Sequence, residues 1–176
     1  MNEKFVISCS PHIRGTENTS SVMRDVLIAL LPALFASVWL FGFRALMVTL
    51  VCTVTAVGAE YIFEKGVHRP ITIGDLSAAV TGVILAFNLP SGIPLWEAAI
   101  GAIVAIVVVK QLFGGLGQNF ANPAITARIV LLVSFAGDMT TWAVPKSDIV
   151  SGATPLAMMA GENIDALPSI GQMFLG

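Results

Sequence analysis

Charged side chains are scarce in this chain. Asp, Glu, Lys and Arg together make up 11% of its 176 residues, whereas a soluble globular domain carries about 25%. Apolar residues make up 56%, so the sequence is also too hydrophobic for a disordered chain. A soluble domain of this size needs a charged surface that so few ionisable residues cannot supply. The composition therefore predicts an integral membrane protein in contact with the lipid bilayer.

Basic charge and cysteine are also in short supply. The formal net charge is −2, which offers no basic field for nucleic acid, so we expect no nucleic-acid partner. The two cysteines, Cys9 and Cys52, lie in a polar stretch and in an apolar run, and they indicate neither a disulfide framework nor a metal site. The first 22 residues lack the apolar core of a cleavable signal peptide. We therefore predict two free thiols and no metal ligands.

Five apolar segments organise the rest, over about 26–41, 45–63, 76–89, 95–113 and 124–136. A straight spanning helix needs about 20 apolar residues, with about 17 as the lower limit. The segments over 76–89 and 124–136 are shorter, which is typical of broken or re-entrant helices. Asn122 precedes Pro123 at the start of the last segment and is a candidate helix cap. The sequence predicts an all-α membrane fold of about five transmembrane or partly broken helices, with a tail over 1–22, a membrane region over 23–137 and a loop over 138–176.

Lys and Arg are distributed unequally between the two sides of the membrane that these segments would cross. Seven of the nine lie in the tail and in the stretches that would share its side of the membrane: Lys4, Arg14, Arg24, Lys65, Arg69, Lys110 and Arg128. Only Arg44 and Lys146 lie on the other side. Because cytoplasmic loops carry an excess of Lys and Arg, the N-terminus is predicted to be cytoplasmic in an inner membrane, and the loop after residue 137 extracytoplasmic.

A few polar residues accompany the apolar segments. The stretch 114–124 contains three glycines with Asn119 and Asn122. It could line a cofactor cavity, or it could simply form a tight turn and a helix cap. The ionisable residues Glu60, Glu64, Asp75, Glu97 and Lys110 lie near segment ends, where we expect their side chains to reach toward water. Arg128 could neutralise a phosphate or a carboxylate, or mark the inner boundary of its segment. With no acid at the centre of a segment, no ion site is predicted.

The loop over 138–176 contains the sharpest motif. Asp148 is followed by Ser151, Gly152, Ala153 and Thr154. Small neighbours leave the Thr154 hydroxyl accessible, and the proline after it restrains Thr154 to an extended backbone. By its chemistry alone the segment is either a turn or a modification acceptor. It resembles the flavinylation motif D-x-x-[ST]-G-A-T, in which a flavin transferase joins FMN to the last threonine through a phosphoester.

Two further stretches resemble the same family. Ser10-Pro11-His12-Ile13-Arg14 with the run 23–33 is similar to the N-terminus of the D subunit of the Rnf complex. The Gly-rich stretch 114–119, with Asn122-Pro123-Ala124 and Ala127-Arg128, is similar to that subunit and to its relative, the B subunit of the sodium-pumping NADH:quinone reductase. The short tail favours the Rnf protein. Because family members are longer, we expect the chain to correspond to their N-terminal half.

The resemblance implies a redox role. Rnf passes electrons from reduced ferredoxin to NAD+ and couples this to the export of Na+ or H+. Its D subunit has a fold of inverted repeats similar to urea and ammonium channels, with a covalent FMN that here would lie on Thr154. A second, non-covalent flavin is also compatible with the family, and the implied partners are the other Rnf subunits and a flavin transferase. The resemblance indicates electron relay and assigns no catalytic residue. The alternatives are an Nqr-type B subunit, a small-solute channel without flavin, and a structural subunit that only holds its partners together.

Overall fold

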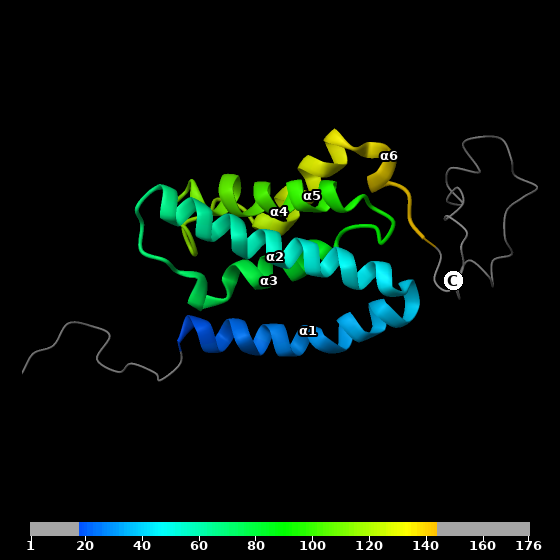
Figure 1. Cartoon of the computed structure of the whole chain (residues 1–176), viewed down its shortest axis with the longest axis horizontal. Helices are drawn as coiled ribbons and strands as arrows, with labels where there is room; N and C mark the ends of the chain where they lie inside the picture. Colours follow the sequence, from blue (N-terminus) through cyan, green and yellow to red (C-terminus); the bar gives the residue numbers. More distant parts are fainter. Residues whose placement is uncertain (1–17, 144–176) are drawn as a thin grey trace, which may run out of the picture.

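The computed structural model describes residues 18–143, and every secondary-structure element in that range is helical. The predicted flavinylation motif, with Ser151, Gly152, Ala153 and Thr154, lies outside the described residues, as does Cys9. Figure 1 shows the elements packed side by side with their axes roughly aligned. In chain order they are α1 (Thr19–Phe41), α2 (Phe43–Gly66), η1 (Ile73–Asp75), α3 (Ser77–Phe87), α4 (Leu95–Ile103), η2 (Val104–Gln111), α5 (Pro123–Ser134) and α6 (Ala136–Met139).

The first two helices are long and apolar. Helices α1 and α2 have 23 and 24 residues, and both are long and apolar enough to cross a membrane. Helix α1 begins at Thr19, inside the stretch 1–22 that the sequence places in the tail. The Ser21 hydroxyl accepts a hydrogen bond from the Asn18 N–H at 3.1 Å, which satisfies one amide of the first turn. Gly42 joins α1 to α2 with φ at +73°, a backbone conformation that glycine adopts without strain.

The remaining predicted segments also form helices, and two of them are short. Helix α3 has 11 residues and α5 has 12. The predicted cap of α5 is confirmed, because the Asn122 side chain accepts hydrogen bonds from the N–H groups of Ala124 and Ile125. The predicted segment 95–113 begins as α-helix and continues without a break as the π-helix η2. There the Leu112 N–H donates to the Val107 carbonyl, five residues earlier.

Helix α2 lies at the centre of the bundle. It packs against α1, α3, α4 and η2, whereas α5 covers α3, α4 and η2 from the other side. The closest approach is at Gly82 of α3, where an added Cβ would lie 2.7 Å from the Cα of Thr53 on α2. Small residues at helix contacts are typical of membrane bundles, in which close backbone packing replaces the hydrophobic effect. Helix α1 buries none of its residues and forms the outer layer of the bundle in Figure 1.

The predicted all-α membrane fold therefore agrees with the described part of the chain. The inverted repeat and the likeness to urea and ammonium channels remain predictions, because they concern a longer protein. The bundle has two ends, each named for a basic residue that lies there. The Arg44 end contains the α1–α2 turn, the loop between α3 and α4, and α6. The Lys65 end contains the end of α2, η1, the end of η2 and the start of α5 (Figure 1).

Candidate functional site

A group of six polar residues lies inside the bundle toward the Lys65 end, and we call it the Lys110 cluster. At its centre the Lys110 ammonium forms an ion pair with Glu60, with Nζ 2.5 Å from Oε1. Lys110 also donates to the Ser77 hydroxyl at 2.6 Å, so it links η2 to α2 and α3. The six residues are Glu60, Glu64, Thr72, Ser77, Lys110 and Gln111.

An amide connects the two acids of this cluster. The Gln111 side chain donates from Nε2 to Glu60 Oε1 at 2.7 Å and to Glu64 Oε1 at 3.2 Å. Glu64 also accepts hydrogen bonds from the backbone N–H of Thr72, at 2.9 Å to Oε2, and from the Thr72 hydroxyl. The i→i+5 hydrogen bonds of η2 widen the helix, and both Lys110 and Gln111 reach the same carboxylate across from α2. The end of the π-helix thus shapes the cluster.

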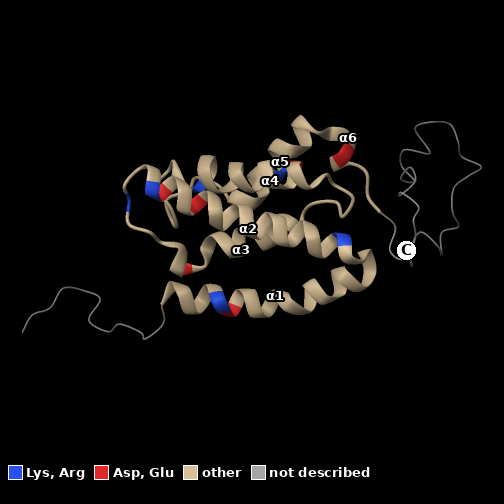
Figure 2. Ribbon diagram, viewed as in Figure 1, with Lys and Arg blue, Asp and Glu red and all other residues tan. Residues whose placement is uncertain are grey.

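The structure corrects the expectation that these side chains reach toward water. Glu60 is fully buried, and Glu64 and Lys110 are 2% exposed. Glu60 and Glu64 continue the face of α2 that also buries Cys52 and Ala56, at a spacing of four residues. That helical spacing was a signal in the sequence. It did not reveal the partner, because Lys110 lies 50 residues further along the chain. Figure 2 shows Lys and Arg next to Asp and Glu at the Lys65 end, with the middle of the bundle almost uncharged.

The Lys110 cluster contains more acid than base. It has two carboxyl groups and one ammonium, which pairs with Glu60. The second oxygen of Glu60, Oε2, is buried without a hydrogen-bond partner among the described residues. The Arg69 guanidinium contributes only a hydrogen bond to the Gln111 carbonyl, at 3.1 Å. Such an oxygen can accept a proton or contact a small cation. The described residues contain no group of three or more His, Cys, Asp or Glu side chains that could hold a metal ion.

Two cavities adjoin the Lys110 cluster. One, of about 150 Å³, is lined by Ser77, Lys110, Asn119 and Asn122. The other, of about 260 Å³, is lined by Glu64, Arg69, Gln111 and the glycines at 114 and 115. The stretch 114–124 therefore forms the turn and the helix cap that its composition allows, and its residues also line these cavities. Asn122 caps α5 and Asn119 donates to the Ala121 carbonyl at 2.7 Å, and both residues also line a cavity.

Arg128, Glu97 and Cys52, which the sequence singles out, lie elsewhere in the bundle. Arg128 is half-buried on α5 and donates to Asn88 Oδ1 at 3.4 Å, and it has no carboxylate partner among the described residues. Glu97 of α4 is 2% exposed at the Arg44 end, which again corrects the expectation of an exposed side chain. Its carboxyl contacts that of Asp138, and its Oε2 atom has no partner in the described part of the chain. Cys52 is a free, buried thiol, as predicted.

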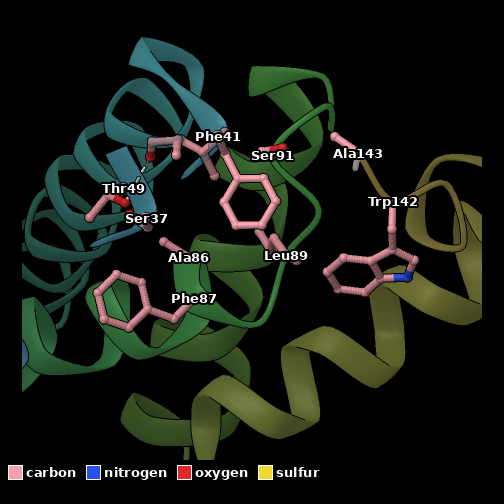
Figure 3. Close-up of a pocket in the computed structure, with 11 residues that line it drawn as sticks. Ser37, Phe41, Thr49, Ala86, Phe87, Leu89, Ser91, Trp142 and Ala143 are labelled. Atoms are coloured by element: carbon pink, nitrogen blue, oxygen red, sulfur yellow. Dashed lines mark hydrogen bonds between the residues drawn. The ribbon is translucent and has the colours of Figure 1, made fainter. Parts of the chain in front are cut away.

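A third cavity, of about 280 Å³, opens at the Arg44 end, and we call it the Trp142 pocket. Figure 3 shows aromatic rings and hydroxyl groups together on its walls. They come from α1, α2, the end of α3 with the loop that follows it, and the stretch after α6, and include Ser37, Phe41, Thr49, Phe87, Ser91 and Trp142. Among the described residues, no charged side chain lines the pocket.

Comparison with known proteins identifies the family. The sequence model of the NQR2, RnfD, RnfE family matches residues 6–176. The chain belongs to this family. The recognition of the NqrB/RnfD family from the sequence is thereby confirmed, and the membrane-protein prediction agrees with it.

Curated members of the NQR2, RnfD, RnfE family are similar over most of this chain. The D subunit of the Na(+)-translocating ferredoxin:NAD(+) oxidoreductase complex of Acetobacterium woodii is 47% identical over 100% of the chain and 56% of its own length. The proton-translocating counterpart of Clostridium ljungdahlii is 44% identical over 88% of the chain and 48% of its own length. The D subunit of the ion-translocating oxidoreductase complex of Shewanella amazonensis is 43% identical over 85% of the chain and 43% of its own length. The chain spans about half the length of these relatives, and none of the three names describes a solute channel.

Proposed function

We propose that this chain belongs to the D subunit of an ion-translocating ferredoxin:NAD+ oxidoreductase complex and relays electrons through FMN on Thr154. The observation that carries the proposal is the 47% identity, along the whole chain, with a relative of that name. The motif that ends at Thr154 adds the attachment site. The expected partners are the other subunits of the complex and, during maturation, a flavin transferase.

In this proposal the chain holds the flavin, and the flavin supplies the electron-transfer chemistry when it is bound. The Thr154 hydroxyl provides the oxygen of the phosphoester. Ser151, Gly152 and Ala153 provide small side chains, so that a transferase can reach that hydroxyl. Thr154 is an attachment residue in this proposal, because its bond to the phosphate stays intact while electrons pass through the ring.

The orientation follows from the distribution of positive charge. We place the N-terminus and the Lys65 end on the cytoplasmic side, because Lys65, Arg69 and Lys110 lie there. The loop with Thr154 then lies on the extracytoplasmic side, beyond the Arg44 end. A reporter enzyme that is active only outside the cytoplasm, fused after residue 143, tests this orientation. A fusion that is well expressed but inactive would contradict it.

The Lys110 cluster supports the ion-translocating half of the proposal. Buried ionisable groups among membrane helices commonly belong to ion or proton pathways. The unpartnered Glu60 Oε2 gives this cluster a place for one more positive charge. Relatives are named for Na+ and for protons, and the geometry of the cluster suits either ion. The coupling ion is therefore an open alternative within the proposal.

A second, non-covalent flavin is not located by the described residues. The cavity beside Asn119 and Asn122 presents suitable donors, but its volume of about 150 Å³ is about half the ~300 Å³ lower limit for pockets that enclose small molecules. The cavity beside Arg69 is lined by Glu64 and by positively charged Arg69 without an aromatic wall. We derive no role for a second flavin from either cavity.

Mass spectrometry tests the proposed function. The full-length protein is produced together with an active flavin transferase, and its peptides are analysed. We expect a gain of about 440 Da, the mass of an FMN phosphoester, on the peptide that contains Thr154. Thr154→Ala should abolish this gain and the flavin fluorescence of the denatured band. Thr141→Ala, which removes a hydroxyl whose one bond among the described residues is to the Gly137 carbonyl, should retain both.

The outcomes separate the alternative functions. An unmodified Thr154 peptide beside a transferase that modifies a control substrate would contradict the redox proposal and favour the channel or the structural subunit. Modification in a complex that reduces quinone rather than NAD+ would favour the Nqr-type B subunit. A fluorescent band that persists in Thr154→Ala would refute the attachment site alone.

A further inference from the structure

The Trp142 pocket lies where the chain leaves the bundle toward Thr154. Trp142 and Ala143 form part of its wall and are the last two residues that the structure describes. Thr154 follows 11 positions after Ala143. An extended chain reaches at most about 3.6 Å per residue, or roughly 40 Å over this stretch. Thr154 is therefore within reach of the pocket along the chain, because Ala143 forms part of the pocket wall.

The lining of this pocket suits a flat, uncharged aromatic ring system. Phe41 of α1, Phe87 of α3 and Trp142 place three aromatic rings on different walls. Figure 3 shows Phe41 near the centre of the view, with Phe87 and Trp142 to either side. Aromatic rings favour stacked or edge-on contacts with one another. The isoalloxazine ring of FMN is planar and aromatic, so these walls can hold it through ring contacts.

Hydroxyl groups supply the polar contacts that such a ring needs. Ser37 donates its proton to the Leu34 carbonyl at 2.9 Å, and Thr49 donates to the Ala45 carbonyl at 2.9 Å. Their oxygens still have acceptor capacity toward the pocket. The Ser91 hydroxyl has no hydrogen-bond partner among the described residues, so it can donate or accept. The polar rim of a flavin, with its carbonyl oxygens and ring N–H, matches this mixture of donors and acceptors.

The lining, rather than the size, favours this pocket over the other cavities, because a larger one, of about 470 Å³, has a wall that is almost entirely apolar. Its volume of about 280 Å³ lies close to the ~300 Å³ at which small-molecule pockets begin, and only the ring has to enter. The cavities around the Lys110 cluster are lined by ionisable side chains. They lie toward Glu64, about 30 Å along α2 from Ala45 at 1.5 Å per residue, which is within the reach of the extended Thr154 stretch, so the lining decides between the cavities. The Trp142 pocket combines an aromatic wall, free hydroxyl capacity and proximity to the Thr154 stretch.

We propose that the Trp142 pocket receives the isoalloxazine ring of the FMN attached to Thr154. This inference rests on the proposed function, because it needs a flavin on that threonine. It assigns the positioning of the ring to Phe41, Phe87 and Trp142, and a hydrogen-bonding contact to Ser91. The phosphoester keeps the flavin on the chain, and the pocket determines where the ring lies.

Flavin fluorescence of the intact complex tests the pocket. A tryptophan in contact with an excited flavin quenches its emission, so Trp142→Phe should raise the emission several-fold while mass spectrometry finds the same amount of attached FMN. Trp96→Phe is the matched control, because Trp96 lies at the same end but stacks edge-on against Phe135 outside the pocket, with ring centroids 5.2 Å apart. This control should leave the emission unchanged.

A second variant tests occupancy without changing a quencher. Ala86→Leu places a larger side chain in the pocket wall, where Ala86 is 6% exposed. The larger side chain should displace the ring. The circular dichroism of the flavin at visible wavelengths, which arises from its asymmetric surroundings, should then fall, while the amount of attached FMN stays the same. Equal emission in the parent and Trp142→Phe would overturn the placement of the ring in the pocket, as would unchanged dichroism in Ala86→Leu. Absence of FMN from the parent protein would instead refute the proposed function, and this inference with it.

Discussion

Removal of the Lys110 ammonium is the sharpest test of the Lys110 cluster. In Lys110→Met the side chain keeps a similar length but loses its charge, so Glu60 loses the ion pair at 2.5 Å. The Gln111 amide then remains the only described donor to Glu60, at 2.7 Å from Oε1. Breaking a buried ion pair by removing one partner costs about 3–5 kcal/mol, because a charge stays buried without compensation. We expect the free energy of unfolding to fall by that amount.

The double variant Lys110→Met/Glu60→Gln separates charge from packing. It removes both charges and leaves a neutral amide that can still bond Gln111. Replacing a whole buried pair by uncharged residues is often neutral for stability, so the double variant should recover most of the loss. Lys65→Met is the matched control, because Lys65 is exposed on the same helix as Glu60, and its ammonium contacts, within the described part of the chain, only the Tyr61 ring, 5.6 Å from the ring centroid. Its effect should stay within about 0.5 kcal/mol.

Denaturation of the purified full-length protein in mixed detergent micelles measures these differences. A loss of 3–5 kcal/mol corresponds to a change of roughly 150- to 5,000-fold in the unfolding equilibrium constant, at 1.36 kcal/mol per tenfold. The reasoning fails if Lys110→Met unfolds like the parent, since Glu60 would then be uncharged or hydrated. It also fails if the double variant is no more stable than Lys110→Met, since packing rather than charge would then explain the loss.

Three further predictions concern single positions, and thermal unfolding of each variant beside the parent checks them. Gly82→Ala should destabilise the bundle by about 1–3 kcal/mol, because the added Cβ would lie 2.7 Å from the Thr53 backbone. Gly58→Ala is the control and should be neutral or stabilising, because its Cβ would meet nothing within 4 Å. Equal effects of the two substitutions would contradict close packing of α2 on α3. Asn122→Ala should cost about 1 kcal/mol through loss of the α5 cap, whereas Asn122→Asp should retain most of it, and a harmless alanine would exclude the cap. Glu97→Gln should be no less stable than the parent, because it removes a buried carboxyl that has an unpartnered oxygen. A fall of more than about 1 kcal/mol in the free energy of unfolding would mean that this oxygen does have a partner in the protein.

Local signals predicted much of the described fold. The five apolar segments all form helices, and the boundary at Asn122 and Pro123 is where the sequence places it. Apolar runs are readable in one dimension, because a helix satisfies its backbone hydrogen bonds with near neighbours. A cap likewise depends on residues within one turn. The start of α1 at Thr19 was missed, because Ser and Thr there look like a polar tail until Asn18 and Ser21 bond each other.

The sequence by itself determined the membrane class, the number of apolar segments, the family resemblance and the motif at Thr154. Each of these depends on composition or on residues adjacent in the chain. The tertiary structure alone decided that Glu60, Glu64, Glu97 and Lys110 are buried. A charged residue near a segment end reads as exposed until a partner is in place, and Lys110 reaches Glu60 only because η2 packs beside α2. The Trp142 pocket depends on tertiary packing for the same reason, since its walls come from four parts of the chain that no local pattern connects.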